Sequence, residues 1–299
     1  MQKYIVIADD LTGSNATCSL FKKIGLRAAS ILKLQGDINY DVDVISYSTA
    51  SRGLDKEEAY KKVSEAIKIL KNKDVLVYNK RIDSTLRGNI GTEINAMLDN
   101  LEDDRIAVVI PSYPDSGRIV VNKTMLVNGV LLENSDAGKD PKTPIKTSCV
   151  ESLIQKGIKY SSTYFTLSDI EQPIEEIVKK IQEAIKKSRV LIFDAVNNED
   201  IIKISKAIIH SNINIVTVDP GPFTLYYSRE LQKKNHLEKK ILMVIGSVTA
   251  TTKKQIEYIL QEEDIFLVKM KIEDFFEKET CLKEIERVIA YIKKGIASY

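Results

Sequence analysis

The stretch Val75-Leu76-Val77-Tyr78-Asn79-Lys80-Arg81-Ile82-Asp83-Ser84-Thr85-Leu86-Arg87-Gly88-Asn89 decides the fold of this chain. Its apolar beginning predicts a buried strand over Val75–Asn79, and the residues after Asn89 have the spacing of an amphipathic helix. Polar and charged residues fill the turn between these two elements. Because open α/β sheets bind their ligands beyond the carboxyl ends of the strands, this turn predicts both a fold class and a binding site.

The side chains of this turn suit a polar, anionic ligand. Such a density of polar groups destabilises a core but costs little around a ligand that pairs with it. Lys80 and Arg81 alternate in direction, so one is expected to face the site and the other to be a surface charge. Asp83 and Ser84 can accept hydrogen bonds from a polyol and donate to it. Arg87, at the start of the predicted helix, can hold a carboxylate or phosphate, with a structural ion pair as the alternative.

The rest of the chain repeats the alternation of strand and helix. We expect strands over Tyr4–Ala8, Val42–Ser46, Ile106–Ile110, Val190–Asp194, Ile215–Val218, Ile241–Ile245 and Phe266–Met270. We expect helices over Ser14–Ile24, Lys56–Lys71, Thr92–Leu101, Ile174–Lys187, Asp200–Ile209, Thr251–Gln261 and Lys283–Lys293. This order predicts an α/β protein whose N-terminal part is an open, mostly parallel sheet with helices on both faces.

Two segments interrupt the alternation. Residues 112–144 form a polar, glycine-containing insertion, in which Asn128-Gly129 predicts a hairpin turn. The polar run Lys233–Lys240 is expected to be a linker that divides the chain into domains 1–235 and 236–299. The second domain has room for about two βα units, so we expect it to be only the start of an α/β domain.

Composition narrows the class of function. Lys and Arg total 44 against 42 Asp and Glu, so the net charge of +2 gives no electrostatic reason to expect nucleic acid or an anionic membrane as partner. The three cysteines are widely spaced and fit reduced thiols rather than a disulfide framework or a metal site. No apolar run approaches a membrane span, and Asp9 and Asp10 interrupt the N-terminal apolar run where a signal peptide needs one. We therefore expect a cytoplasmic protein.

Three further strand ends carry candidate site residues. Asp9 and Asp10 follow the first strand, where a carboxylate could bind substrate hydroxyls, hold Mg²⁺ or remove a proton; helix capping is the alternative. Arg52 occupies the corresponding position after the second strand. Ser247 lies in a Gly-Ser turn that could receive a nucleotide, although a plain strand-to-helix turn explains it equally well. The chain has neither a Gly-x-x-x-x-Gly-Lys-Ser/Thr phosphate loop nor a Gly-x-Gly-x-x-Gly fingerprint.

These motifs, taken in order, resemble the four-carbon acid sugar kinases, a family long described as a domain of unknown function. The resemblance is carried by Ala8-Asp9-Asp10-Leu11-Thr12-Gly13, the Lys80–Asn89 segment, Asn128-Gly129-Val130 with Asp140-Pro141, Asp194-Ala195 and Gly246-Ser247. It implies an acid-sugar-binding domain followed by a nucleotide-binding domain. It also implies a phosphotransferase that uses ATP and Mg²⁺ to phosphorylate the terminal hydroxyl of a threonate- or erythronate-like acid.

The resemblance also implies roles for particular residues. The residues expected to line the acid-sugar pocket are Asp10, Arg52, Lys80, Asp83, Ser84 and Arg87. Ser247 is expected to contact the nucleotide, and either Asp10 or Asp83 could orient or deprotonate the attacking hydroxyl. No protein metal ligand is assigned. The expected partners are a small sugar acid and ATP, with a homodimer as an open alternative.

The family's glycine-rich nucleotide loops lie beyond Tyr299, so the nucleotide-binding domain is expected to be incomplete in this chain. Asp219, in an Asp-Pro-Gly-Pro turn, stands where the family pattern leads us to expect a small residue. The alternative function is therefore a non-catalytic module that binds the acid.

Overall fold

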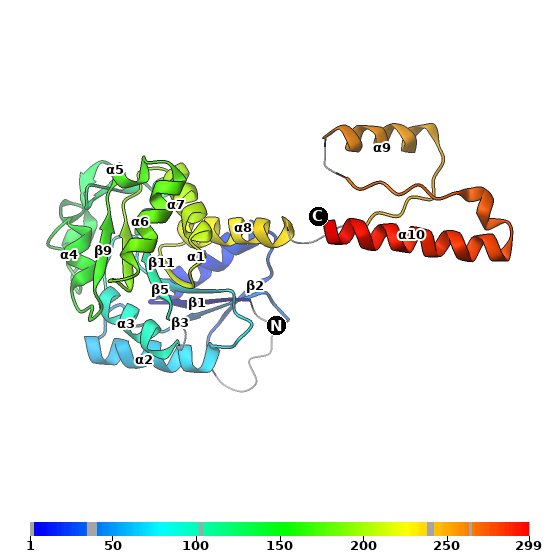
Figure 1. The fold of residues 1–299 in the computed structure, drawn as a ribbon. Helices are drawn as coiled ribbons and strands as arrows, with labels where there is room; N and C mark the ends of the chain where they lie inside the picture. Colours follow the sequence, from blue (N-terminus) through cyan, green and yellow to red (C-terminus); the bar gives the residue numbers. More distant parts are fainter. Residues whose placement is uncertain (1–2, 35–40, 102–103, 238–241, 263–264, 299) are drawn as a thin grey trace. The chain divides into compact units, whose positions relative to one another are not determined.

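The computed structural model describes residues 3–34, 41–101, 104–237, 242–262 and 265–298. The chain divides into two compact units, Met1–Lys233 and Lys234–Tyr299 (Figure 1). None of the described helices is both long and apolar enough to cross a lipid bilayer.

The first unit is built on one sheet of eight parallel strands. Their spatial order is β2 (Ala28–Ile31), β3 (Val44–Ser48), β1 (Tyr4–Ala8), β4 (Val77–Arg81), β11 (Ile215–Asp219), β5 (Ile106–Val109), β10 (Val190–Phe193) and β9 (Ser162–Phe165). The inner strands are buried on both faces, which is why they read as nearly continuous apolar runs in the sequence. The predicted fold class, an open and mostly parallel α/β sheet, is confirmed for this unit.

The order of the strands reverses around β1. The chain leaves β1 for β2 and β3 on one side and then crosses to β4 on the other side. Ala8, the last residue of β1, is in register with Ser48 of β3 and Arg81 of β4. In open α/β sheets, the crevice that receives a ligand lies at such a reversal, at the carboxyl ends of the strands. The residues after β1, β3 and β4 therefore share one edge of the sheet.

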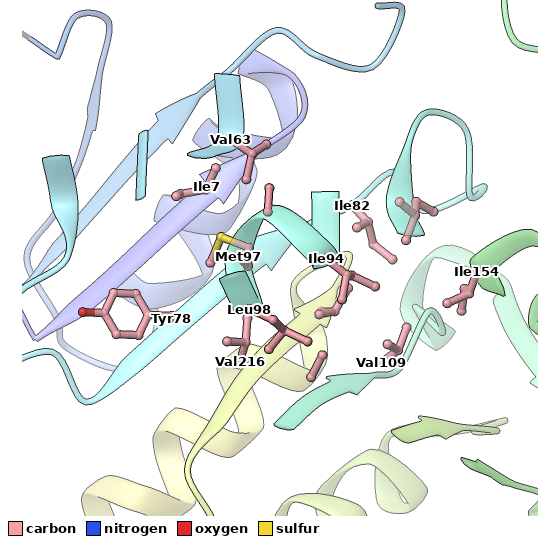
Figure 2. Packing of buried hydrophobic residues seen from close by; sticks show 14 of the residues in the cluster. Ile7, Val63, Tyr78, Ile82, Ile94, Met97, Leu98, Val109, Ile154 and Val216 are labelled. Carbon is pink, nitrogen blue, oxygen red and sulfur yellow. The ribbon is translucent and has the colours of Figure 1, made fainter. Parts of the chain in front are cut away.

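Helices cover both faces of the sheet (Figure 1). The helices of this unit are α1 (Leu11–Lys22), α2 (Lys56–Leu70), α3 (Ile90–Asn100), α4 (Val150–Gln155), α5 (Leu167–Ile170), α6 (Ile174–Ala184), α7 (Asn198–His210) and α8 (Pro222–Leu237). Apolar residues of α2 and α3 pack with Tyr78 and Val216 on one face (Figure 2). Helices α1, α6, α7 and α8 contribute to a separate core on the other face.

The insertion at residues 112–144 contains a small antiparallel sheet. It consists of β6 (Arg118–Val121), β7 (Thr124–Val127) and β8 (Val130–Leu131). Asn128 and Gly129 join β7 to β8 with φ values of +50° and +79°, the left-handed conformation that an Asn-Gly turn adopts readily. The predicted hairpin is therefore confirmed. Short 3₁₀ turns at Pro114–Ser116, Leu132–Asn134 and Asp136–Lys139 complete the insertion.

Several boundaries differ from the predictions for physical reasons. Strand β4 continues two residues past Asn79, because Lys80 and Arg81 are buried and in register with both neighbouring strands, β1 and β11. Helix α1 begins at Leu11, three residues before the predicted start at Ser14, because Asp10 caps it. The edge strands β2 and β9 were not predicted, since they are short and only partly buried.

The second unit contains α9 (Ala250–Glu262), a 3₁₀ turn at Ile272–Phe275 and α10 (Lys278–Ser298). The strands expected over Ile241–Ile245 and Phe266–Met270 are wrong for the described residues, which are irregular there; Ile241 lies outside them. Most of their apolar side chains are exposed, for example Val244 at 79% and Met243 at 62%. A strand persists only when paired, and neither segment pairs with another strand in the described part of the chain. The expected linker is helical as far as Leu237, and residues 238–240 lie outside the described part.

Candidate functional site

Arg52 is the centre of a cluster of charges at the crevice. Its Nε and Nη2 donate to Oδ2 and Oδ1 of Asp9 at 2.6 and 3.0 Å, a two-point hydrogen bond that only a guanidinium can make. Its Nη1 lies 2.8 Å from Oδ2 of Asp10, and its Nη2 lies 3.7 Å from Oδ1 of Asp83. One arginine from the loop after β3 therefore joins the carboxylates that follow β1 and β4.

The two neighbouring aspartates have different environments. The Asp9 side chain is 3% exposed, and burial raises the pKa of its carboxyl, an effect that the hydrogen bonds from Arg52 offset only in part. Asp10 is 28% exposed and caps α1, because its Oδ1 accepts from the backbone N–H of Gly13 at 2.7 Å. Asp10 is therefore the more accessible of the two carboxylates.

Asp83 and Arg87 form a second charged group on the same edge. Nε and Nη2 of Arg87 donate to the two carboxylate oxygens of Asp83 at 2.6 and 3.1 Å, and Thr85 Oγ1 donates to Oδ2 at 2.6 Å. Burial pushes the pKa of Asp83 upward, but the bonds from Arg87 and Thr85 and the charge of Arg52 together lower it to about 2. Asp83 is thus held as a carboxylate.

Asp140, in the insertion at residues 112–144, contacts the Asp83–Arg87 pair. Oδ2 of Asp140 accepts from Nη1 of Arg87 at 2.8 Å, and its Oδ1 accepts from the backbone N–H groups of Lys142 and Thr143. These bonds hold the pKa of Asp140 well below its usual range. The sequence placed Asp140 in a family motif, but only the structure shows that it binds Arg87.

The backbone of the loop fixes how closely the charged groups approach. Gly88 has a φ of +97°, and a Cβ at this position would lie 3.3 Å from Cγ of Arg52. Leu86 also adopts a positive φ of +57°. A non-glycine residue in this conformation is uncommon and costs energy, so the rest of the loop must stabilise it. The Arg52 and Arg87 loops are consequently packed against each other.

Lys80 lies beneath the crevice rather than in it. Its side chain is 0% exposed, and its Nζ is 2.8 Å from Oε2 of Glu93 on α3. The expectation that one of Lys80 and Arg81 is a surface charge is wrong, because Arg81 is also buried, at 8% exposure, on the opposite face of the strand. Burial lowers the pKa of Arg81, and its Nε has no hydrogen-bond partner among the described residues.

Asp219 is the last residue of the neighbouring strand, β11. It is completely buried, and its Oδ2 accepts from the backbone N–H groups of Gly221 and Thr224 at 2.7 and 3.2 Å. Its Oδ1 accepts from Nδ2 of Asn79 at 2.9 Å. Burial raises the pKa of this carboxyl. Asp219 therefore organises the turn into α8, which accounts for a carboxylate where we expected a small residue.

The structure brings together five of the predicted acid-site residues, namely Asp10, Arg52, Asp83, Ser84 and Arg87. Ser84 is partly buried in the same loop. Ser247 belongs to the second unit, where its Oγ accepts from Thr252 Oγ1 at 2.9 Å in the segment before α9. Sequence reasoning missed the contributions of Glu93 and Asp140.

The carboxylates of the site are paired with arginines. Among the described residues, no group of three or more His, Cys, Asp or Glu side chains could hold a metal ion. Mg²⁺ in kinases commonly keeps several waters and binds through one or two carboxylates together with the phosphates of the nucleotide. A role for Mg²⁺ bound with ATP therefore stays a prediction here.

The fold and the cluster define an open α/β protein with charged side chains gathered at the point where its strand order reverses. A family model described as "Sugar-binding N-terminal domain" matches residues 4–227, and the chain belongs to this family. The resemblance inferred from the motifs is thereby confirmed.

Two relatives with assigned activities are kinases of sugar acids. A D-erythronate kinase of Heliobacterium modesticaldum is 37% identical over 96% of this chain and 67% of its own length. A D-threonate kinase of Salmonella typhimurium is 29% identical over 86% of this chain and 61% of its own length. These relatives confirm the predicted enzyme class, and this chain spans about two thirds of their length.

A solved structure from Bordetella bronchiseptica has the same fold. It aligns with a TM-score of 0.68 and 24% identity over 87% of this chain and 65% of that one. That protein is described as a domain of unknown function with bound citrate, in a domain-swapped dimer. A homodimer of the present chain stays a prediction.

Proposed function

We propose that this chain binds a four-carbon sugar acid of the threonate or erythronate type and forms the acid-binding part of an ATP-dependent kinase. The observation that carries the proposal is the convergence of Asp10, Arg52, Asp83 and Arg87 on one strand-switch edge. The relatives give separate support, because a D-erythronate kinase and a D-threonate kinase match this chain over most of its length.

The charged groups retain capacity for a ligand. A guanidinium has five N–H donors, and Arg87 uses three of them on Asp83 and Asp140. The remaining donors of Arg87 can bind the carboxylate of the acid. The hydroxyl of Ser84, for which we find no hydrogen bond in the described residues, can donate to the same ligand.

Asp10 is the better candidate to orient the attacking hydroxyl. A general base works best when its pKa is near the working pH, and a pKa of about 2 makes Asp83 a weak base. The Asp83 side chain is also only 9% exposed, against 28% for Asp10. Phosphoryl transfer depends mainly on positioning and charge stabilisation, so the more exposed carboxylate is the better placed of the two to orient the hydroxyl.

We further propose that Ser247 contacts the nucleotide and that Mg²⁺ accompanies it. Ser247 lies just before α9, whose first backbone N–H groups can bind phosphate. The kinase relatives support the use of ATP.

The test is to incubate the 299-residue chain with ATP, Mg²⁺ and a panel of four-carbon sugar acids, and to measure ADP and phosphorylated acid. Calorimetry with the same acids separates binding from turnover. Saturable acid binding with transfer supports the kinase proposal, whereas acid binding without ATP binding supports the non-catalytic alternative. Absence of binding by every acid would contradict both.

A further inference from the structure

A buried ion pair lies beneath the charged crevice, on the α3 face of the sheet. Lys80 Nζ and Glu93 Oε2 are 2.8 Å apart, and the two side chains are 0% and 1% exposed. Buried ion pairs seldom stabilise a fold more than apolar side chains of similar size, because desolvation opposes the attraction. Stability alone therefore does not explain why this pair lies here.

The pair is hydrogen-bonded to three strand ends. Lys80 Nζ also donates to the backbone carbonyl oxygens of Arg81 at 2.9 Å and Ile7 at 3.3 Å. The other oxygen of Glu93, Oε1, accepts from Ser51 Oγ at 2.5 Å. These contacts reach the end of β1, the loop after β3 and the end of β4.

Each of these contacts adjoins a residue of the crevice. Ser51 immediately precedes Arg52, and Ile7 lies two residues before Asp9. The connection continues in the backbone, where the N–H of Arg52 donates to the carbonyl of Asp9 at 3.3 Å and Thr49 donates to Ala8. The positions of Arg52 and Asp9 therefore depend on the same buried network.

We propose that Lys80 and Glu93 are positioning residues that hold the ends of β1, β3 and β4 at the spacing Arg52 needs to reach Asp9, Asp10 and Asp83. This inference rests on the proposed sugar-acid site. The three N–H donors of Lys80 all have protein acceptors, and its side chain has no exposed surface, so it acts through Arg52 rather than by touching the ligand. This positioning role differs from the role in substrate binding that the family resemblance implied for Lys80.

The test replaces the pair by apolar side chains of similar size in the 299-residue chain, as Lys80→Met with Glu93→Leu. Removing both charges together avoids leaving one of them buried and unpaired. We expect the double variant to fold and its dissociation constant for D-erythronate to rise at least tenfold. The matched control is Lys123→Met with Glu151→Leu, which removes a partly exposed 2.7 Å ion pair that contacts none of the crevice residues. We expect this control to bind like the unchanged chain.

A second variant tests the positioning role if the double variant does not fold. Ser51→Ala removes the hydrogen bonds of this hydroxyl to Glu93 and to Thr49 and leaves both buried charges in place, and it is expected to raise the dissociation constant at least threefold. A change smaller than twofold in the folded double variant, or in Ser51→Ala when the double variant is unfolded, overturns the proposal.

A ligand-independent readout separates this proposal from the proposed function. The Arg52 Nε–H, which donates to Asp9, should exchange with solvent at least tenfold faster in the double variant or in Ser51→Ala. If the unchanged chain binds no acid, the proposed function fails, but this exchange rate still tests the positioning role. An unaltered exchange rate overturns it.

Discussion

Replacing Asp83 by asparagine should show how much the ion pairs of this carboxylate contribute to the free energy of unfolding. The folded chain lowers the pKa of this carboxyl from 3.8 to about 2, and its side chain is only 9% exposed. Because a tenfold change in proton affinity corresponds to about 1.4 kcal/mol, this lowering contributes about 2 kcal/mol to the free energy of unfolding at pH 7. We expect Asp83→Asn to lose at least that amount.

The pH dependence of this loss has a defined sign. A carboxyl group whose pKa is lower in the folded state stabilises the fold above its unfolded pKa and loses that contribution as the pH falls through the folded pKa. The difference between the original chain and Asp83→Asn should therefore fall from about 2 kcal/mol at pH 7 to about half of that at pH 3.

Urea unfolding followed by circular dichroism at the two pH values measures this difference directly, and the chain has no tryptophan for fluorescence. The control is Asp41→Asn, because the Asp41 side chain is 91% exposed in its ion pair with Arg27, and exposed pairs contribute little. A loss below about 0.5 kcal/mol for Asp83→Asn at pH 7, or one that grows on acidification, would refute the reasoning.

Three other substitutions test separate features of the crevice. Gly88→Ala should lower the free energy of unfolding by about 1–2 kcal/mol more than Gly129→Ala, because both have positive φ but only Gly88 also approaches Arg52; urea midpoints compare them. Arg52→Met leaves Asp9 buried without its main partner, so we expect a loss of about 3 kcal/mol at pH 7. Without Arg52 the pKa of Asp9, which burial already raises, should rise further, so that keeping this carboxyl buried destabilises the fold more as the pH rises above the unfolded pKa; the loss should therefore be smaller at pH 5 than at pH 7 in the same assay. Asp10→Asn keeps a good helix cap and should change stability by less than about 1 kcal/mol, while acid turnover falls at least tenfold; equal turnover would remove Asp10 from the site.

The gathering of the candidate site residues at one edge of the sheet could be predicted from sequence because the governing rules are local. Asp10, Arg52 and Asp83 each follow an apolar strand, and parallel strands bring their carboxyl ends to one edge. The same periodicity predicted the sheet and most of its helices. No knowledge of distant contacts was needed for these conclusions.

The partners of the charged residues could not be predicted in this way. Glu93 reads in sequence as an ordinary acidic residue in the first turn of a helix, and nothing there links it to Lys80. One signal was available: Tyr78, Lys80 and Ile82 are two residues apart along the chain and therefore share one face of the strand. Tyr78 and Ile82 are both buried on that face. A lysine in such a series indicates a buried ion pair.

The second unit shows the limit of reasoning from apolar runs. The segments at 242–245 and 266–270 have strand-like composition, but most of their side chains are exposed and no strand pairs with them in the described part of the chain. Composition favours a strand, whereas pairing decides whether one forms.

The most direct test of the account is a calorimetric titration of the 299-residue chain with D-erythronate, compared with Arg87→Met and with Arg27→Met as an exposed control. We predict saturable binding by the original chain and the control, and roughly 30-fold weaker binding by Arg87→Met, which is the loss of about 2 kcal/mol expected for a charge-assisted contact. Equal affinities for Arg87→Met and the original chain would contradict the account.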